Sequence, residues 1–466
     1  MVKPTINLDA DQQHALDLIQ SGENVFLTGK AGSGKSAVLT GLCALNPEDT
    51  AFLAPTGLAA MNIGGSTVHR FFGLHASLLP RDYVPTLEPE QVALINAVRT
   101  IVVDEISMVR SDVFSAMDCT LRHLAPADRK HLAFGGKRIV VVGDFYQLPP
   151  VVTSPEDGRQ LVDDFGGIYA FQTRSWDCAY FQMVTLSKPH RHASDPDYLE
   201  VLDALRRGSV DQSGRDLQER IAWLNQRVRI CAPPRDVPNL CTTRRAAAEI
   251  NHTRDSELPG AVVVSTAVVS GQFDEDACPT ETRLEFRVGS RVVLVNNRYG
   301  IDGSLEYANG ALGTVVYPHR SERAVDVELD NGKCVTVRTH LWLKYKYIVV
   351  TDFGTGQPRI EPKVIGSFSQ LPMKLAYALT VHKAQGMTME GAHVSLGERV
   401  FASGQLYAAL SRCRSLKGLS LDREVRPIDV KVGPAVVGFH DSLLAAEQDR
   451  IESFGADPRE RYMIFK

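Results

Sequence analysis

The chain has 466 residues, of which 44% are hydrophobic and 23% are charged, and its formal net charge at pH 7 is -4. These proportions are ordinary for a globular enzyme of two to four domains with a large buried core, and they exclude a disordered chain. The net negative charge disfavours a protein that coats nucleic acid by bulk attraction, although a local basic groove could still hold a strand.

Membrane, secretory and metal-centre classes are disfavoured as well. No apolar run approaches the roughly 20 residues that a membrane helix needs, and the first residues lack the apolar block of a secretory signal. The eight cysteines are scattered, with no C-x2-C pair and no Cys/His cluster at zinc spacing. We therefore expect a soluble, cytoplasmic protein without a disulfide framework, a structural metal or a membrane partner, and the compactness of the chain favours a bacterial or phage enzyme.

The first 180 residues alternate short apolar, β-branched runs with stretches of helical pattern. The runs are NVFLTG, TAFLAPTG, RTIVVDE and RIVVVGD. Such runs are typical of buried parallel strands, so this half predicts a doubly wound α/β domain. Ligands of such sheets bind at the carboxyl ends of the strands, where Gly29, Thr56, Asp104 and Asp144 fall. The sequence thus predicts one crevice at which four strand ends converge.

The segment GKAGSGKS follows the first predicted strand and has the spacing of a phosphate-binding loop. Its glycines permit a tight curl in which consecutive N–H groups surround a polyphosphate at a helix start, Lys35 reaches the β- and γ-phosphates, and the Ser36 hydroxyl binds Mg2+. A chance glycine-rich turn is the alternative, which the position between a predicted strand and a predicted helix disfavours. We expect ATP and Mg2+ as ligands, bound by Gly32, Ser33, Gly34, Lys35 and Ser36.

Acidic and amide side chains follow two later strands. Asp104 and Glu105 end the run IVV, where a first carboxylate can hold Mg2+ and a second can deprotonate a water. Taken alone, the two acids could equally form a solvated strand end; together with the loop upstream, they favour hydrolysis. Asp144 ends another strand, and Gln147 suits a sensor of the γ-phosphate better than a base. A bland surface loop is the alternative for that segment.

Two stretches interrupt the α/β pattern. Residues 75–95 contain three prolines and no clear strand, and we interpret them as a small insertion. A second α/β region begins near VTLSKPHRH, gives way to short alternating segments, and resumes as helical pattern in MKLAYALTVHKAQG and QLYAALSRCRS. Asn-Gly pairs at 309–310 and 331–332 are hairpin signals, so the interruption predicts a small β-barrel.

Six segments resemble, in order, the motifs of Pif-type helicases of superfamily 1B. They are GKAGSGKS, APTGLAAMNIGGSTVHRFFGL, VVDEISMV, FGGKRIVVVGDFYQLPPV, LAYALTVHKAQGMT and LYAALSRCRSLKGL. Ala133 stands where the segment before the third motif usually has proline. The resemblance implies an ATP-dependent DNA helicase that moves 5′ to 3′ on single-stranded DNA and unwinds duplex, forked or otherwise structured DNA. It also implies a monomer in solution with a place in DNA repair, recombination and telomere maintenance, including G-quadruplex DNA.

The same resemblance implies an architecture of two RecA-like P-loop NTPase motor domains. A small wedge would be inserted in the first and a Src-homology-3-like β-barrel in the second. The implied boundaries are 1–74 and 96–182 for the first motor domain, 75–95 for the wedge, 183–284 and 372–466 for the second motor domain, and 285–371 for the barrel.

Family roles around the nucleotide carry over where residues match. Gln12 corresponds to the glutamine that reads the adenine edge, with Gln13 as a rival. Arg412 in ALSRC and Arg191 in KPHRH correspond to two arginines that the second motor domain presents to the γ-phosphate, where a guanidinium stabilises the transferring phosphoryl group. The family usually has glutamine after the latter arginine, and this chain has His192, so a solvated basic turn is the alternative there.

Family roles toward nucleic acid carry over in the same way. Small hydroxyls and backbone groups at loop tips suit phosphate contacts, which position a strand without reading its sequence. The matching residues are Thr56, Thr67, His69, Thr380, His382 and Lys383. His69 and His382 could each be a packed or capping histidine instead. Gly386, in the same motif as the last three, corresponds to a nucleotide-binding position.

Three rival interpretations remain open from the residues. A phosphate-loop kinase or a metabolic ATPase that does not act on a nucleic-acid strand would leave Arg412, Gln147 and the second half of the chain unexplained. A DNA-binding scaffold with an inactive motor would have lost Lys35 or Glu105, and both are present. Within the helicases, a RecD-type motor or an RNA translocase is the third.

Overall fold

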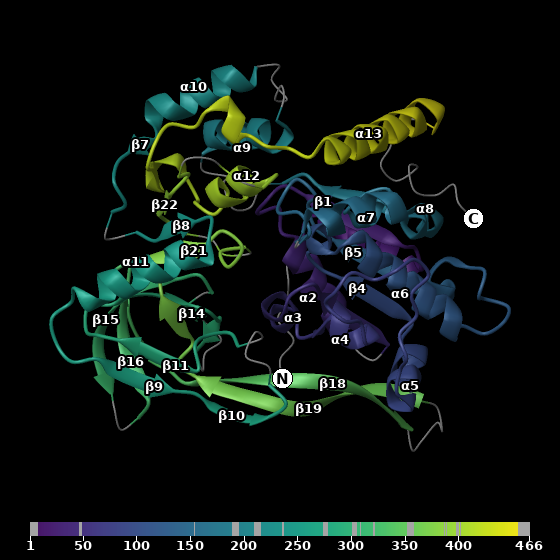
Figure 1. Cartoon of the computed structure of the whole chain (residues 1–466), viewed down its shortest axis with the longest axis horizontal. Helices are drawn as coiled ribbons and strands as arrows, with labels where there is room; N and C mark the ends of the chain where they lie inside the picture. The colour runs from purple at the N-terminus through teal and green to yellow at the C-terminus, as the bar shows by residue number, and fades with distance from the viewer. Residues whose placement is uncertain are drawn as a thin grey trace.

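Two parallel sheets and an antiparallel insert make up the molecule (Figure 1). In this computed structural model the described residues run from 8 to 454, apart from 46–48, 153, 189–194, 209–215, 235–236, 274–277, 301–304, 308, 320–321, 352–357, 386, 388, 398–399 and 401. Among the helices of this described part, none combines the length and the apolar character needed to cross a membrane. The α/β class predicted from the sequence is confirmed.

Six parallel strands form the first sheet in the order β3-β2-β4-β5-β1-β6. The strands are β1 (Val25–Gly29), β2 (Thr50–Ala54), β3 (Ser66–Thr67), β4 (Thr100–Val103), β5 (Arg138–Val142) and β6 (Gln182–Leu186). The accompanying helices are α1 (Ala10–Ser21), α2 (Lys35–Leu45), α3 (Gly57–Asn62), α4 (Val68–Phe72), α5 (Pro89–Ala97), α6 (Ser111–Leu124), α7 (Pro155–Phe165) and α8 (Arg174–Ala179). The predictions of β1, β2, β4 and β5 are confirmed.

Both faces of this sheet are buried, because successive side chains of a strand point to opposite sides. On β1, Phe26 enters a core with α4 and α6, whereas Val25 and Leu27 enter a second core with α1 and α2. This is why the strands read as continuous apolar runs rather than as alternating ones. Helices on both faces leave the carboxyl ends of the strands as the open edge for a ligand.

The second sheet has five short parallel strands in the order β21-β8-β22-β23-β7. They are β7 (Arg229–Ile230), β8 (Asn239–Cys241), β21 (Ala378–Thr380), β22 (Ala392–Val394) and β23 (Leu419–Leu421). The helices of this half of the chain are α9 (Pro196–Arg207), α10 (Leu217–Arg227), α11 (Arg244–Ser256), α12 (Gln405–Leu410) and α13 (Pro434–Phe454).

The helical pattern expected for MKLAYALTVHKAQG is wrong. This segment contains β20 (Met373–Leu375) and the fully buried β21, followed by a turn that extends to Gln385. A short apolar run that is buried on both sides has no periodicity that separates a strand from a helix. The helix expected in QLYAALSRCRS is present as α12.

An antiparallel sheet in the order β17-β16-β15-β12-β20 lies within the second half of the chain. Its remaining strands are β12 (Arg291–Leu294), β15 (Leu312–His319), β16 (Ala324–Leu329) and β17 (Cys334–Arg338). Residues 331–332 join β16 to β17, and Gly332 has a φ of +81°, as a hairpin turn of this kind requires. Residues 309–310 join two strands that do not pair with each other, so that hairpin expectation is wrong.

Further antiparallel strands extend from this insert. They are β9 (Val263–Thr266), β10 (Val268–Gly271), β11 (Arg283–Phe286), β13 (Arg298–Tyr299), β14 (Leu305–Tyr307), β18 (His340–Thr351) and β19 (Pro358–Gln370). The long β18–β19 hairpin passes below the rest of the molecule and packs against α5 of the first half (Figure 1).

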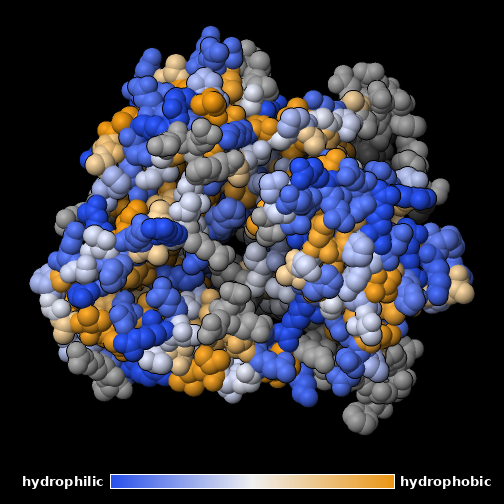
Figure 2. Space-filling model, viewed as in Figure 1, coloured by the Kyte–Doolittle hydropathy of each residue, from blue (hydrophilic) through white to orange (hydrophobic). Residues whose placement is uncertain are grey.

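Apolar side chains gather on the surface over β9 and β10, where Val264, Val268 and Val269 are exposed (Figure 2).

The segment 75–95 is held to the first half by polar contacts, which include an ion pair between Arg81 and Asp164 at 3.3 Å. It contains no strand and runs into α5, which begins at Pro89. The Arg110 guanidinium pairs with the buried Asp112 carboxylate at 2.7 Å and donates to the carbonyl of Ser77 at 3.0 Å. The backbone N–H of Leu79 donates to the same carboxylate oxygen, Asp112 Oδ2, at 2.9 Å. The irregular segment is therefore fixed at its base.

The C-terminal helix α13 returns from the second sheet to the first (Figure 1). Its Phe439 ring stacks on Phe171 with centroids 4.2 Å apart and also contacts Trp176 and Phe145. From the sequence, α13 falls in the range expected for the second motor domain, but its apolar side chains belong to the core of the first sheet. Aromatic partners from distant parts of the chain decide this placement, and helical periodicity does not reveal them.

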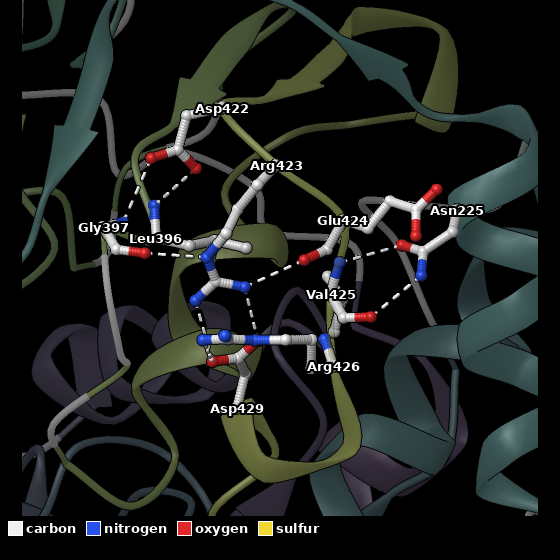
Figure 3. A network of polar contacts seen from close by, with 9 residues as sticks. All are labelled: Asn225, Leu396, Gly397, Asp422, Arg423, Glu424, Val425, Arg426 and Asp429. Atoms are coloured by element: carbon white, nitrogen blue, oxygen red, sulfur yellow. Dashed lines mark hydrogen bonds and ion pairs between the residues drawn. The ribbon is translucent and has the colours of Figure 1, made fainter.

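A polar network fixes the segment that leads into α13 (Figure 3). The buried Asp429 carboxylate accepts hydrogen bonds from Arg423 Nη2 at 2.8 Å and from the backbone N–H of Arg426 at 2.9 Å. Burial alone would raise the pKa of Asp429, but these donors outweigh burial and lower that pKa to about 2. Asn225 of α10 pairs with both backbone groups of Val425. The path of the chain between the two halves is therefore defined by side-chain contacts.

We expect Phe439→Ala to destabilise the protein by about 2 kcal/mol, because it removes a partly buried ring from an aromatic cluster. The measurement is the shift in urea midpoint followed by circular dichroism. Leu444→Ala on the same helix is the matched control, since Leu444 is 56% exposed, and it should cost less than about 0.5 kcal/mol. Equal effects of the two substitutions would contradict the packing of α13 on the first sheet.

Candidate functional site

The loop between β1 and α2 has a backbone that requires glycine. Gly32 and Gly34 have φ values of +81° and +86°, in the left-handed region. A Cβ atom at Gly29 would lie 2.6 Å from Ser33 Oγ and 2.9 Å from the carbonyl oxygen of Leu186. The loop therefore presents backbone N–H groups at the start of α2, as an anion-binding loop does.

The side chains of this loop line the same place. Lys35 Nζ donates to the carbonyl oxygens of Gly29 at 2.7 Å and Lys30 at 3.2 Å. Burial lowers the pKa of Lys35, while nearby Asp144 and Glu105 oppose that shift. Ser33 Oγ is buried without a hydrogen-bond partner among the described residues, and Ser36 is exposed at the first turn of α2.

Gln12, and not its neighbour Gln13, faces the loop. Gln12 closes a capping box with Asp9 at the start of α1, and its Nε2 donates to the carbonyl oxygen of Gly34 at 3.3 Å. The Gln13 amide donates to Asp17 on the exposed side of the helix at 2.8 Å. The geometry favours Gln12 as the residue beside a bound nucleotide.

Asp104 and Glu105 lie just beyond β4 in a half-buried position. Glu105 has a φ of +51°, a strained value for a residue other than glycine and one that recurs at functional sites. Burial, reinforced by the neighbouring Glu105, raises the pKa of Asp104 to about 7. Burial also raises the pKa of Glu105, and the cations Lys35 and Arg412 oppose this. Burial and raised pKa values are typical of acids in a crevice, and they disfavour the alternative that Asp104 and Glu105 form a solvated strand end.

Asp144, beyond β5, joins the two halves of the molecule. Its buried carboxylate accepts from Arg206 of α9, with Nη2 at 2.8 Å and Nε at 3.1 Å. Burial alone would raise the pKa of Asp144, but Arg206 outweighs it and lowers that pKa. The Tyr407 hydroxyl of α12 accepts the backbone N–H of Ala31 at 2.8 Å and donates to Asp144 Oδ2 at 3.5 Å. A residue of the second half thus touches the loop directly.

Gln147 and Arg206 complete this network. Gln147 is buried, and its Nε2 lies 3.5 Å from Asp144 Oδ2, so its amide faces the same carboxylate. The Arg206 guanidinium also lies over the Tyr146 ring, 4.3 Å from its centroid. Lys30 of the loop pairs with Asp203 of α9 at 3.1 Å. Sequence reasoning missed Arg206 and Asp203, which lie outside every quoted motif.

Arg412 lies two residues after the end of α12 and is buried, with a relative exposure of 2%. Its Nε donates to the carbonyl oxygen of Ala408 at 2.8 Å and its Nη2 to Ser411 Oγ at 2.9 Å. Burial lowers the pKa of Arg412, and the nearby Glu105 opposes that shift. Among the described carboxylates, none lies within ion-pair distance of this guanidinium. A buried cation of the second half thus lies close enough to Glu105 of the first half to interact with it electrostatically.

Two expected nucleotide-site residues cannot be placed. Arg191, with His192 beside it, and Gly386 lie outside the described residues. Gln385, immediately before Gly386, donates through Nε2 to Glu105 Oε2 at 3.0 Å. Sequence reasoning quoted this glutamine in a motif without giving it a role.

The expected strand-binding residues form two groups at the carboxyl ends of strands. In the first half, Thr56 Oγ1 accepts from the N–H of Ala59 and Thr67 Oγ1 from that of Arg70, each at 3.3 Å, so both hydroxyls cap helices. His69 follows on α4, where burial and then Arg110 lower its pKa.

In the second half, the group follows β21. Thr380 is buried, and its Oγ1 accepts the backbone N–H of Lys383 at 3.2 Å. His382 and Lys383 are exposed on the turn that Thr380 caps. Lys383 and His382 are therefore exposed at the surface, and Gln385 lies in the same turn.

A family model described as PIF1-like helicase matches residues 7–213. The ATP-dependent DNA helicase Pif1 of Bdellovibrio bacteriovorus is 32% identical over 445 residues, which cover 93% of this chain and 92% of that protein. The chain belongs to the Pif1 family. The expected family is thus confirmed by a relative of matching length, and not only by the motifs.

Longer relatives and solved structures agree with this. Human ATP-dependent DNA helicase PIF1 is 33% identical over 457 residues, covering 96% of this chain, but the chain spans only 65% of the human protein. Bacteroides sp Pif1 in complex with ADP-AlF4 superimposes with a TM-score of 0.83 at 29% identity, covering 94% of this chain and 98% of that one. Bacteroides Pif1 bound to ssDNA superimposes with a TM-score of 0.63 at 30% identity, covering 95% of this chain and 98% of that one.

We expect Arg206→Ala to destabilise the protein by about 3 to 5 kcal/mol, because it leaves the Asp144 carboxylate buried without its main partner. Thermal and urea unfolding measure this. Arg245→Ala removes an exposed i,i+4 pair with Glu249 and should leave unfolding unchanged within error. A similar stability of the two variants would mean that the Asp144–Arg206 pair does not hold the halves together.

Proposed function

We propose that the chain is an ATP-dependent DNA helicase that moves 5′ to 3′ on single-stranded DNA and opens duplex, forked or structured DNA. The observation that carries this proposal is the meeting of the phosphate loop, Glu105 and the buried Arg412 across the two halves of the molecule. The human and Bdellovibrio relatives are named ATP-dependent DNA helicases, and Bacteroides Pif1 has been solved with ssDNA. We further propose that the protein is a monomer in solution.

The proposed domains follow the sheets. The first parallel sheet is taken as one RecA-like motor domain, spanning 1–74 and 96–182, and the second as the other, from 183–284 and 372 onward. Three elements are exceptions. α13 packs with the first sheet, β6 pairs with β1 of the first sheet although it runs past residue 182, and β20 pairs with β12 of the antiparallel sheet although it lies after residue 372. The antiparallel sheet in 285–371 is assigned as the Src-homology-3-like barrel, and 75–95 as the wedge that separates strands.

ATP would bind at the loop after β1. Backbone N–H groups around Gly32, Ser33 and Gly34 suit the phosphates, and Gln12 suits the adenine edge. Lys35 would exchange its two carbonyl acceptors for oxygens of the β- and γ-phosphates. A loop that needs glycine at three places is well explained by close approach of a polyphosphate.

Mg2+ fits the donors that remain, Ser36 and Asp104. A hydroxyl and a carboxylate are hard oxygen ligands, and Mg2+ usually takes only one or two protein ligands beside phosphates and water. The raised pKa of Asp104 also fits, since a divalent cation would compensate a carboxylate that burial disfavours. When bound, the ion would neutralise charge on the phosphate oxygens.

Glu105 is proposed as the base that takes a proton from the attacking water, and Arg412 as the guanidinium that stabilises the transferring phosphoryl group. Arg191 is proposed as a second such arginine, and Gln147 as the sensor next to Asp144. Arg412 comes from the second half of the molecule, so hydrolysis would require the two halves to be closed. Closure and opening would then move one half past the other along the strand.

Single-stranded DNA would contact the two groups of residues at the carboxyl ends of the β-strands. They are Thr56, Thr67 and His69 in the first half and Thr380, His382 and Lys383 in the second. Hydroxyl, imidazole and ammonium groups suit phosphates, so sequence preference should be weak. Each base-pair step opened costs ~1.4 kcal/mol on average, which hydrolysis must supply.

We expect Lys35→Ala to abolish ATP turnover, because the lysine neutralises the phosphates, and Glu105→Gln to bind ATP but lose at least about 100-fold in hydrolysis. Steady-state phosphate release and binding of a fluorescent nucleotide measure the two effects. Normal hydrolysis by Glu105→Gln would overturn its assignment as the base.

Arg412→Ala should lower the ssDNA-stimulated kcat by about 1,000-fold or more while the affinity for a single strand stays within twofold, because its proposed target is the phosphate alone. Filter binding and phosphate release are compared on the same preparation. A parallel loss of strand affinity and turnover would contradict this separation of roles.

The proposal as a whole is tested on two matched partial duplexes, one with a 5′ single-stranded tail and one with a 3′ tail. Opening of the 5′-tailed duplex alone, dependent on ATP, is the expected result. Opening of the 3′-tailed duplex alone would keep the motor and overturn the direction. If neither duplex opened and DNA did not accelerate ATP hydrolysis, the result would favour an ATPase that does not act on nucleic acid.

A further inference from the structure

Gln385 bridges the two halves of the molecule at the proposed catalytic base. Its Nε2 donates to Glu105 Oε2 at 3.0 Å. An ionised carboxylate can only accept, so the amide must turn its nitrogen toward Glu105 and its oxygen away. That oxygen, Oε1, is buried and has no hydrogen-bond partner among the described residues. Buried acceptors are as a rule hydrogen-bonded, and a water bound in the site can supply the donor that the described residues do not.

The surroundings of Gln385 place its amide beside the groups proposed for ATP hydrolysis. Glu105 interacts electrostatically with Lys35 of the phosphate loop and with Arg412, so the amide lies where the γ-phosphate of ATP would be attacked. Gln147, the glutamine assigned as a sensor, turns its amide toward Asp144 instead. Of these two glutamines, Gln385 is therefore the one that reaches the base and still has a free acceptor.

Building on the proposed ATP hydrolysis, we propose that Gln385 is a further catalytic residue, which orients the attacking water together with Glu105. One O–H of the water donates to Glu105 and the other to Gln385 Oε1, which directs an oxygen lone pair at the γ-phosphorus. The oxygen–phosphorus bond forms as the bond between the γ-phosphorus and the bridging oxygen breaks. ADP leaves with that electron pair, Glu105 takes one proton, and the second proton stays on the phosphate.

The turn that carries Gln385 also connects it to the proposed strand contacts. The N–H of Ala384 donates to the carbonyl oxygen of Thr380 at 2.9 Å, and the N–H of Gln385 to that of His382 at 3.2 Å. With the Lys383 N–H on Thr380 Oγ1, these bonds make one compact unit of the turn. A strand held by His382 and Lys383 would thus set the position of Gln385 on Glu105. This gives a direct route by which DNA accelerates hydrolysis.

The test uses Gln385→Ala and the volume-conserving Gln385→Met in the full chain, with Gln226→Ala, an exposed glutamine on α10, as the control. We expect both Gln385 variants to lower the ssDNA-stimulated kcat at least about 30-fold, with KM for ATP and Kd for an oligonucleotide within twofold of wild type. Affinity for ADP with aluminium fluoride on DNA should fall by a similar factor, while affinity for ADP alone stays unchanged. Gln226→Ala should match wild type in every assay.

Several outcomes would overturn the inference. A kcat within twofold of wild type in Gln385→Met would remove Gln385 from the reaction. Equal losses in strand affinity and kcat would make it a strand-binding residue only, and equal losses of affinity for ADP and for ADP with aluminium fluoride would make its role structural. If wild type itself showed no ssDNA-stimulated hydrolysis, the proposed function would fail together with this inference. If wild type and the Gln385 variants showed the same ssDNA-stimulated kcat, the inference alone would fail.

Discussion

The buried Asp144–Arg206 ion pair is the contact on which the arrangement of the molecule depends. A charge inside a protein is tolerated only with a close partner, and here the two partners belong to different halves. Separating the halves would expose or orphan both charges, so the pair favours contact between them. Tyr407 extends the same contact to the N–H of Ala31 in the phosphate loop. The loop and the second half are therefore coupled before any ligand is considered.

The crevice around this contact departs from what stability alone would favour. Glu105 holds a left-handed backbone, Asp104 is half-buried beside it, and Arg412 is buried without a described carboxylate partner in ion-pair range. Each feature costs free energy in isolation. Together they place two cations, Lys35 and Arg412, around acids whose charge they oppose, and a polyphosphate with Mg2+ would complement such a distribution.

The halves are also connected through the end of the chain. The network around Asp429 fixes the exit from the second sheet, and Phe439 then enters the aromatic core of the first. His440, next along α13, stacks on Tyr146 at 4.5 Å, and Tyr146 in turn carries the Arg206 guanidinium on its ring. The C-terminal helix thus contacts the same network as the site, so its packing and the geometry of the crevice are linked.

Local patterns in the sequence determined β1, β2, β4 and β5 of the first sheet, the phosphate loop, the acid pair after β4 and the antiparallel, strand-rich character of the insert. These features follow from burial, from periodicity and from glycine backbone freedom, which neighbouring residues encode. The tertiary structure alone decided that α13 packs on the first sheet, that residues 373–385 form strands and a turn, and that Gln385 reaches Glu105 from 280 positions away. Arg206 was equally invisible, because its role comes from a partner on another sheet. Contacts between distant segments are fixed by how the two halves pack, and no local pattern carries that information.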